Sequence, residues 1–320
     1  MFTLRKSSTN LVNLVEASIV HLDFMKSIHD MEKLYRGQFL ANAVRRYENL
    51  WLPMIASVGE DSSQMAAPLD IEWVWYLHML SPHAYENDCQ RLVSKFIDHK
   101  CQTNEQKKMA LEKSRCIWER LYPQEPFIAD SEKFSQDSTV QSSKLSCDLY
   151  REAMNEKMFY YQLSMPHYTD QKFLLNAVKR YRKFLNLHSS GSNEFFCPTC
   201  DIKLIWHVHK AHPRIYRKEC GSLVLYQDIK SHGENGLVVS TVAITEERWF
   251  MTYGDTYLLA GTTYRREPPQ SQGAPCAGAW NDLSAPIYSL KLIKVAVCNF
   301  LKTLRTYYPS VRTAIQWSTL

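Results

Sequence analysis

The sequence predicts a mainly α-helical protein made of two homologous helical repeat halves, followed by a short irregular segment and the start of a β domain. Three observations support this class. Residues 70–78, DIEWVWYLH, recur as DIKLIWHVH at residues 201–209. Apolar residues recur at helical spacing through much of the chain. The 320 residues include only 10 glycines, which favours helices over a sandwich or barrel rich in turns.

The repeat extends well beyond this segment. NAVRRY at residues 42–47 recurs as NAVKRY at residues 176–181. Each copy then reaches a proline, a tyrosine and a cysteine, which are Pro82, Tyr85 and Cys89 in one copy and Pro213, Tyr216 and Cys220 in the other. A duplicated unit of this length predicts a tandem repeat. The predicted parts are a first half (1–121), a linker (122–144), a second half (145–255), a Gly/Pro-rich loop (256–286) and an incomplete β-type segment (287–320).

The first half is expected to contain five helices. Capping side chains at residues 8–10 precede the first of them. Pro68 begins the motif helix, because proline is tolerated in the first turn, and Pro82 begins the next helix. A charged amphipathic pattern predicts the last helix of this half. The expected ranges are 11–25, 31–58, 68–80, 82–99 and 104–121.

The second half is expected to repeat this helical set after a linker of weak periodicity. Its expected helices are 145–163, 168–187, the motif helix at 201–209 and 242–253. Residues 221–229 are expected to be extended. Residues 287–297 alternate apolar and polar side chains, which is typical of a strand.

Composition narrows the functional classes. Hydrophobic residues make up 45% of the chain, enough for packed cores, and the net charge of +5 is spread rather than focused as in a nucleic-acid module. No apolar run approaches the roughly 20 residues that span a bilayer, and residues 1–10 lack the apolar segment of a secretory signal. Nine cysteines without a regular framework are expected to be reduced. The expected location is the cytoplasm, with the nucleus as the alternative, and no membrane partner is expected.

One stripe of the motif helix is identical in both copies. Positions i, i+4, i+7 and i+11 share a helix face. The identical stripe consists of Ile71, Trp75, His78 and Pro82 in one copy, and Ile202, Trp206, His209 and Pro213 in the other. The opposite stripe differs at every position and is expected to face solvent; it consists of Glu72, Tyr76, Met79 and His83 against Lys203, His207, Lys210 and Arg214.

The identical stripe has two interpretations. It can be core, with each histidine neutral and hydrogen-bonded, since tryptophan and isoleucine bury well. Alternatively, two Trp-x-x-His helices meet across a pseudo-twofold axis and line one pocket, with histidine as its polar group. In both copies an aspartate lies in the first turn, where a carboxylate meets free backbone amides. The candidate site residues are Asp70, Trp75, His78, Asp201, Trp206 and His209.

A metal site has weak support in the sequence. Cys197 and Cys200 have the spacing of half a zinc site, but no second pair follows at suitable spacing. The two cysteines are expected at a solvated helix start. His207 and His209 lie about 200° apart around a helix and cannot share an ion. The sequence therefore predicts no metal and no cofactor.

Catalytic motifs are also missing from the sequence. It contains no Gly-x-Ser-x-Gly, no phosphate-binding glycine loop and no His-Glu-x-x-His. A thiol–imidazole pair could be assembled from Cys89 or Cys220 with a motif histidine, as in any chain rich in both residue types. The basic pairs at residues 45–46 and 107–108 are short and are expected on solvated helix faces. A non-enzymatic protein is expected.

Five segments of the chain resemble the N-terminal helical region of the glycine-rich domain-containing proteins. The segments are HLDFM (21–25), RYENLWLP (46–53), PLDIEWVW (68–75), PTCDIKLIWHVH (198–209) and GTTYRREPP (261–269). They occur in the order of the family and cover about residues 10–270. The last segment gives a family motif loop, formed by Tyr264, Arg265, Glu267, Pro268 and Pro269.

The resemblance implies a helical domain that is not an enzyme. Because catalytic, phosphate-binding and complete metal motifs are missing, the leading hypothesis is a scaffold or regulatory protein that acts inside the cell through a protein partner. Plant members of the family are associated with development and stress responses, and some carry an RNA-recognition segment. This sequence has no glycine-rich tail and no aromatic ribonucleoprotein motif. RNA binding is therefore not carried over from the family. The alternatives to a scaffold are a module that binds a small ligand or metal through the paired Trp-x-x-His helices, and an RNA-associated protein. The family's middle region resembles a β-sandwich, so residues 287–297 are expected to be its first strand, with the chain stopping within it.

Overall fold

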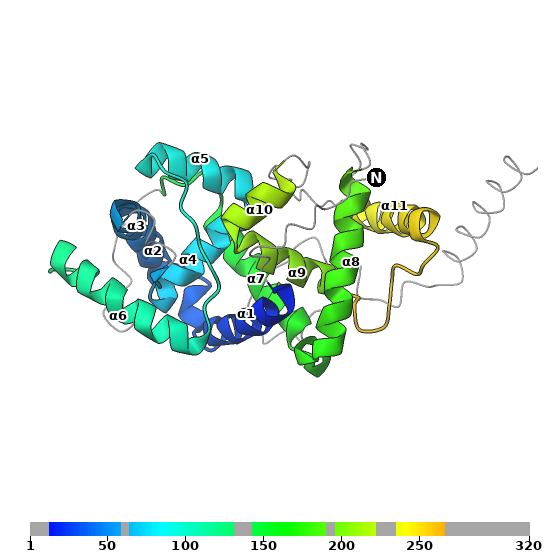
Figure 1. Ribbon diagram of the computed structural model, residues 1–320, viewed down its shortest axis with the longest axis horizontal. Helices are drawn as coiled ribbons and strands as arrows, with labels where there is room; N and C mark the ends of the chain where they lie inside the picture. The colour runs from blue at the N-terminus through cyan, green and yellow to red at the C-terminus, as the bar shows by residue number, and fades with distance from the viewer. Residues whose placement is uncertain (1–12, 59–63, 131–142, 190–195, 222–234, 266–320) are drawn as a thin grey trace, which may run out of the picture. The chain divides into compact units, whose positions relative to one another are not determined.

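The computed structural model describes residues 13–58, 64–130, 143–189, 196–221 and 235–265. Within these ranges the chain is mainly helical and contains no strand (Figure 1). Both repeat halves belong to one compact unit, formed by residues 1–232 and 240–263. The other unit, residues 233–239 and 264–320, lies mostly outside the described residues. The extended segment expected after residue 221, the loop beyond residue 265 and the expected strand at 287–297 also lie outside them.

Among the described residues, six α-helices belong to the first half and five to the second. The first set is α1 (Leu14–His29), α2 (Gly37–Arg46), α3 (Leu52–Val58), α4 (Leu69–Met79), α5 (Pro82–Val93) and α6 (Asn104–Leu121). The second set is α7 (Leu149–Leu163), α8 (Gln171–Ser189), α9 (Cys200–Lys210), α10 (Pro213–Cys220) and α11 (Asn235–Tyr253). The two motif helices are therefore α4 and α9. No helix among the described residues combines the length and the apolar character needed to cross a bilayer.

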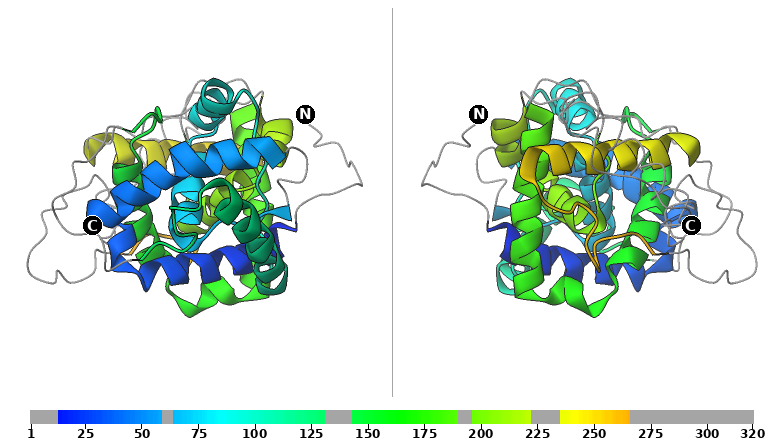
Figure 2. Two further views of the ribbon diagram at one scale, coloured as in Figure 1. Left: turned by 90° about the vertical axis from the view of Figure 1, so that its left-hand side faces the viewer. Right: turned by 90° about the vertical axis from the view of Figure 1, so that its right-hand side faces the viewer.

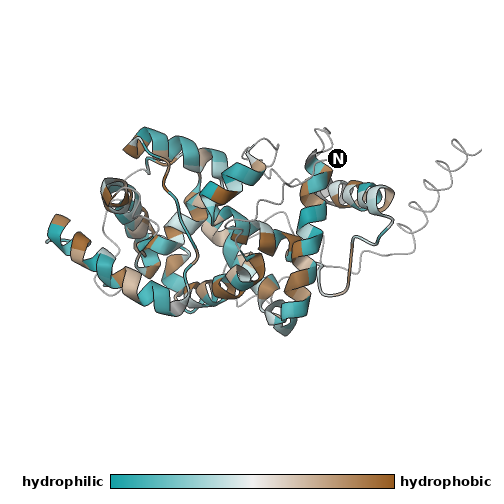
Figure 3. Ribbon diagram, viewed as in Figure 1, coloured by the Kyte–Doolittle hydropathy of each residue, from teal (hydrophilic) through white to brown (hydrophobic). Residues whose placement is uncertain are grey.

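Local sequence signals place several helix ends. The Asn13 side chain accepts from the backbone N–H of Val15 at 3.2 Å and caps α1. Thr103 and Gln106 form a reciprocal capping box at the start of α6. The expected helix over residues 104–121 is confirmed at both ends. Figure 3 shows hydrophobic and hydrophilic residues interspersed along α6 and α8, as in amphipathic helices.

The expected single helix over residues 31–58 is wrong in two places: a separate short turn covers Glu32–Leu34 before the helix begins, and a π-helical turn lies within the rest. Gly37 begins α2 with φ of +77°, a left-handed conformation that glycine adopts at little cost. Residues 47–51 then form a π-helical turn before α3. In the second half the corresponding helix, α8, runs without interruption.

One extra residue in the first half explains the π-helical turn. Two aromatic positions are four residues apart there and three apart in α8, yet their partners in the motif helices are equivalent. These positions are Tyr47 and Trp51, which packs on Trp75, against Tyr181 and Phe184, which packs on Trp206. A π-bulge absorbs such an insertion while the flanking helix faces keep their direction.

The helix expected over residues 82–99 ends early, at Val93, because Ser94 adopts a left-handed conformation with φ of +56°. A non-glycine residue pays about 1–2 kcal/mol for this region. We expect Ser94→Gly to raise the free energy of unfolding by up to about 1 kcal/mol, since part of that gain is lost to the freer unfolded glycine chain. Urea unfolding checks this. The control Ser164→Gly, at a helix end with φ of −71°, should bring no gain.

The first helix of each half packs against the other half. Helix α1 contacts α8 and α9, its counterpart α7 contacts α4, and α1 also contacts α7 (Figures 1 and 2). This exchange is reciprocal, as in a twofold interface between two copies of one surface. The junction of the two halves, formed by α1, α4, α7 and α9, is therefore pseudo-twofold.

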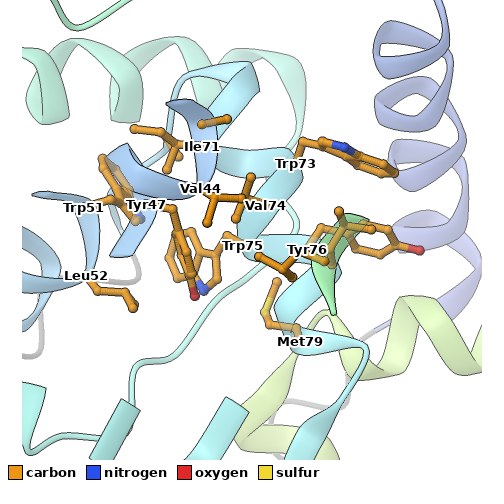
Figure 4. Packing of buried hydrophobic residues seen from close by; sticks show 14 of the residues in the cluster. Val44, Tyr47, Trp51, Leu52, Ile71, Trp73, Val74, Trp75, Tyr76 and Met79 are labelled. Atoms are coloured by element: carbon orange, nitrogen blue, oxygen red, sulfur yellow. The ribbon is translucent and has the colours of Figure 1, made fainter. Parts of the chain in front are cut away.

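Helix α4 lies at the centre of the first half and is buried almost all round. Figure 4 shows Trp75 lying beside Tyr47, while Trp73 and Tyr76 lie toward the opposite side of the helix. A helix that is apolar on every face is expected in the interior of a larger helical array. One side of α4 therefore serves the core of its own half, and the other serves the junction.

The described ends of the expected linker pack against the first half. Phe127 is buried, and its carbonyl accepts a hydrogen bond from Arg46 at 2.7 Å. At the other end, Glu48 in the π-helical turn accepts from the Lys144 backbone N–H at 2.9 Å. The Ser146 backbone N–H donates to Asp88 at 2.7 Å. The intervening residues 131–142 lie outside the described ranges.

Candidate functional site

The identical stripe of the motif helices lies in the core of its own half. Trp75 and His78 are buried in the first half, as are Trp206 and His209 in the second. The indole Nε1 of Trp75 donates to the Tyr85 hydroxyl at 2.9 Å. The equivalent bond in the second half joins Trp206 and Tyr216, also at 2.9 Å. The proline and tyrosine that follow each motif thus fold back onto its tryptophan.

Each motif histidine lies between a tyrosine and a carboxylate. The Tyr47 hydroxyl is 2.9 Å from Nδ1 of His78, and Asp88 Oδ2 is 3.2 Å from its Nε2. In the second half the corresponding distances are 2.9 Å from Tyr181 to His209 and 3.4 Å from its Nε2 to Glu219. These neighbours all come from the same half as the histidine. The structure therefore places His78 and His209 in two equivalent environments, one in each half.

The tyrosine and histidine of each group are buried, whereas the carboxylate is buried in the first half (Asp88) and partly exposed in the second (Glu219). Burial, followed by the nearby His212, lowers the pKa of His209 to about 3, so its ring is neutral at pH 7. A neutral ring has one N–H. With Nδ1 accepting from the tyrosine, Nε2–H points at the carboxylate. Every polar ring atom is thus directed at an internal group, which suits a packing role.

We expect Tyr47→Phe and Tyr181→Phe to destabilise the fold by similar amounts, about 1–2 kcal/mol each, since each leaves a buried histidine nitrogen without its hydroxyl. Urea unfolding monitored by tryptophan fluorescence gives both values. Tyr150→Phe, on an exposed tyrosine of α7, is the control and should change stability by less than about 0.5 kcal/mol. A large effect at only one of the two buried sites would contradict their equivalence.

The aspartates of both motifs form buried ion pairs with arginines. Arg46 Nε is 2.9 Å from Asp70 Oδ2, and Arg180 Nε is 2.7 Å from Asp201 Oδ2. The prediction of a solvated face is therefore wrong for Arg46, which is fully buried. Sequence reasoning missed both arginines as partners. The signal was present, because each copy of the NAV-x-RY segment keeps an arginine at this position.

Each of these arginines also lies over a tryptophan from the last helix of its half. The guanidinium of Arg46 lies 5.1 Å from the ring of Trp118, and that of Arg180 lies 5.3 Å from the ring of Trp249. Other donors of each guanidinium reach backbone carbonyls, that of Phe127 from Arg46 at 2.7 Å and that of Tyr257 from Arg180 at 2.8 Å. The planar guanidinium of arginine can stack on an aromatic ring and donate hydrogen bonds to a carboxylate and to carbonyls at the same time. One buried cation thus ties three separate segments together in each half.

The opposite stripe, which differs between the copies, is expected to face solvent, and this expectation is wrong at the centre of the stripe. Tyr76, Met79 and His207 are buried, whereas His83 and Arg214 at its end are exposed. The Tyr76 hydroxyl donates to Glu156 Oε2 at 2.7 Å and lies 3.2 Å from Nδ1 of His207. This stripe therefore forms the junction of the two halves.

The pseudo-twofold axis explains why these positions differ between copies. Tyr76 and His207 occupy the same place in the repeat, and they contact each other. Near a twofold axis a residue faces its own counterpart. If both positions held a tyrosine, or both a histidine, two identical side chains would have to hydrogen-bond to each other and to Glu156 at the same place. A tyrosine that donates and a histidine that complements it resolve that conflict.

The junction holds a buried carboxylate. Burial alone raises the pKa of Glu156, but His207 and Lys203, with hydrogen bonds from His207 and Tyr76, lower it to about 2. Lys203 Nζ lies 3.8 Å from Glu156 Oε1. Burial lowers the pKa of His207 to about 4 despite the neighbouring carboxylate. At neutral pH the junction therefore contains an ionised glutamate beside a neutral imidazole.

The cysteines do not lie at a solvated helix start, as the sequence predicted. Cys197 and Cys200 are both buried, and the Cys197 backbone N–H donates to Thr245 Oγ1 of α11 at 2.9 Å. Burial raises the pKa of Cys197 to about 12 and does the same for Cys89 and Cys220. These thiols are protonated at neutral pH and are poor nucleophiles. In the part of the chain that the structure describes, no group of three or more His, Cys, Asp or Glu side chains is placed to hold a metal ion.

Only the start of the family motif loop is described. Tyr264 and Arg265 are partly buried, and Glu267, Pro268 and Pro269 lie outside the described residues. Directly before the loop, the Thr262 carbonyl accepts from the Cys200 backbone N–H at 2.9 Å. The His167 and Tyr168 side chains both reach the Gly261 carbonyl, at 2.9 and 3.2 Å. The chain entering the loop is thus fixed to the start of α9.

Comparison with known proteins agrees with this architecture. The family model described as glycine-rich domain-containing protein-like matches residues 3–88 and 84–219. Glycine-rich domain-containing proteins 1 and 2 of Arabidopsis thaliana are 33% and 32% identical over 276 and 275 residues, or 81% of this chain. These regions cover 34% and 35% of the two relatives, so the chain spans about a third of their length. No solved structure matches the chain. Both repeat halves are thus accounted for, and the chain belongs to the glycine-rich domain-containing protein-like family.

Proposed function

We propose that this chain is a non-enzymatic scaffold or regulatory module that acts inside the cell by holding a protein partner. One observation carries the proposal: the chemically distinctive residues shared by both halves are used for internal packing. Arg46 with Asp70, and His78 with Tyr47, are buried and have exact counterparts in the second half. The two halves, each held together by equivalent buried contacts and joined at one junction, form a rigid body whose surface can bind a partner.

The protonation states support a packing role over catalysis. The pKa of each of the buried thiols Cys89, Cys197 and Cys220 lies far above neutrality, and the pKa of His209 lies far below it. A general base works best with a pKa near the operating pH. These groups therefore lack the protonation behaviour that acid–base or thiol catalysis needs. Binding is the function that such a frame can perform without them.

The proposal includes a compartment and a biological setting. The described cysteines carry free thiols, which suits the reducing cytoplasm, with the nucleus as the alternative. A role in development or stress responses follows from the resemblance of the sequence to plant members of the family. Imaging of a fluorescent fusion before and after osmotic stress tests both points. An exclusively secreted fusion would overturn the compartment.

Cross-linking followed by affinity purification tests the scaffold. We expect one or a few proteins to co-purify with the tagged chain in near-equal molar amounts. The folded variants His78→Gln and His209→Gln should retain them, because these rings have no contact role at the surface. Treatment with ribonuclease before elution should leave the partners bound. Release by ribonuclease would favour the RNA-associated alternative, and the absence of any stoichiometric partner would overturn the scaffold.

A further inference from the structure

A small pocket with both polar and apolar lining opens beside the junction of the two halves. Its walls come from α1, α4, α6, the segment 99–102 and the end of α9. The cavity volume is about 40 Å³. Since a water molecule needs about 10–15 Å³ by the same measure, the cavity holds about three groups of that size. The pocket is thus suited to a small chemical group.

His21 gives this pocket an unfilled polar position. The side chain is buried and lines the pocket, and its Nε2 has no hydrogen-bond partner among the described residues. Burial, followed by the nearby His207, lowers the pKa of His21 to about 3, so the ring is neutral. A buried nitrogen left without a partner costs about 1–3 kcal/mol. Native proteins rarely leave one in place without a ligand, ion or water to pair with it.

The remaining charged groups of the pocket favour an anion. The one carboxylate in its lining, Glu72, is 2.8 Å from Nε2 of His99. The other ring nitrogen of His99 donates to the Ala211 carbonyl at 2.6 Å. Because both nitrogens face acceptors, His99 carries two protons and neutralises Glu72. Lys100 and Lys107 also line the pocket and supply its positive charge. The ionised Glu156, which accepts from Tyr76 in the pocket wall, has its own cationic neighbour in Lys203 at 3.8 Å.

An apolar wall completes the site. Phe24 lines the pocket, and the Lys107 ammonium lies 5.6 Å from the centre of its ring. Val20, one helical turn before it on α1, lines the same side. A ligand therefore meets a cationic and hydrogen-bonding surface beside an apolar one, which is the usual make-up of a small-molecule site.

We propose that this pocket binds the carboxylate group of a small organic acid. A carboxylate has three heavy atoms, which matches the cavity. One oxygen accepts from His21 Nε2–H, the other meets Lys107, and the apolar remainder of the acid lies against Phe24. The site lies outside the identical stripe and goes beyond the scaffold function, so the two proposals can fail separately.

Titration with propionate tests the site in the full chain. Nuclear magnetic resonance of protein labelled in its histidine rings should show a saturable shift of the His21 signals, with a dissociation constant of about 1 mM. Lys107→Gln should weaken binding about tenfold. Lys108→Gln, which removes the adjacent exposed lysine of α6, should change it less than twofold. Propionamide has the same shape without the charge and should not bind.

Three results would overturn the carboxylate site. They are a His21 signal that propionate does not saturate, equal losses in Lys107→Gln and Lys108→Gln, and equal binding of propionamide. Saturable binding of inorganic phosphate in place of propionate would reject the carboxylate as the ligand group. The variant His21→Phe should lose binding if it folds. If His21→Phe does not fold, the comparison of Lys107→Gln with Lys108→Gln and the His21 signals of the unaltered chain still test the site.

Discussion

Replacing Arg46 with methionine is expected to lower the free energy of unfolding by about 3–5 kcal/mol. The change removes the buried cation beside Asp70 and leaves that carboxylate without its ion-pair partner in the interior. It also removes the guanidinium from the Trp118 ring and from the carbonyls of residues 126 and 127. Urea unfolding followed by tryptophan fluorescence measures the loss. A protein of ordinary stability would be close to unfolding after this single change.

The neighbouring arginine supplies a matched control. Arg45 is partly exposed and pairs with Glu125 at 2.7 Å. Surface pairs contribute about 0–1 kcal/mol, so Arg45→Met should cost no more than that. In the second half, Arg180→Met should match Arg46→Met, and Lys179→Met should match the control. Equal costs for Arg45→Met and Arg46→Met would show that the buried pair does not stabilise the frame.

A double substitution separates the pair from the cavity. Arg46→Met with Asp70→Leu removes both charges and fills the space with apolar atoms. Since a buried ion pair can be replaced by hydrophobic side chains at little net cost, the double variant should be more stable than Arg46→Met alone. A double variant that is less stable would mean that the hydrogen bonds to the surrounding carbonyls, rather than the unpaired charge, dominate the effect.

The sequence was informative about the helices because their signals are local. Capping residues, helical spacing and breakers place α6 correctly and bring both motif helices close to their real bounds. The ends that differ depend on single backbone conformations. Ser94 adopts a left-handed conformation, which a serine in the sequence does not predict. The π-helical turn at residues 47–51 is recognised only when the two halves are compared in space.

The junction could not be predicted from the repeat, because residues identical in both copies indicate only the packing inside each half. Residues that serve the core of each half meet the same environment twice and stay alike, as Trp75 and Trp206 do. Residues at the pseudo-twofold axis meet their own counterparts, so complementarity makes them differ, as Tyr76 and His207 do. The rule that differing positions face solvent therefore fails at the axis. The same reasoning makes the differing residues of α4 and α9 the ones that define how the halves join.

Acidification from pH 7 to pH 4 is expected to unfold the compact unit, through histidines that are buried as neutral rings. Burial is the main cause that lowers the pKa of each, to about 3 or 4 against an ordinary value of 6.5. The five are His21, His188, His207, His209 and His212. Below pH 6.5 the unfolded chain binds protons at these rings and the folded chain does not. Stability therefore falls as the pH drops through this window.

The size of this effect follows from proton linkage. Each such histidine removes about 1.4 kcal/mol of stability for every pH unit between 6.5 and its folded pKa. Five acting together exceed an ordinary domain stability of about 5–15 kcal/mol within two or three pH units. His99 does not contribute to this loss, because Glu72 raises its pKa against the effect of burial and the ring is protonated in both states below pH 6.5. Glu156 adds a further loss only below about pH 4.5, because the unfolded chain then binds a proton at this residue and the folded chain does so only near pH 2.

Replacement of His188 isolates one contribution to the acid transition. This ring is buried, and its Nδ1 lies 3.0 Å from the Phe184 carbonyl within the same helix. His188→Leu removes a site that only the unfolded chain protonates, so the midpoint of acid unfolding, followed by circular dichroism, should move to lower pH. His83→Gln, at an exposed histidine of α5, should leave it in place. A fold that persists to pH 3, or equal shifts in both variants, would show that the buried neutral rings do not control acid stability.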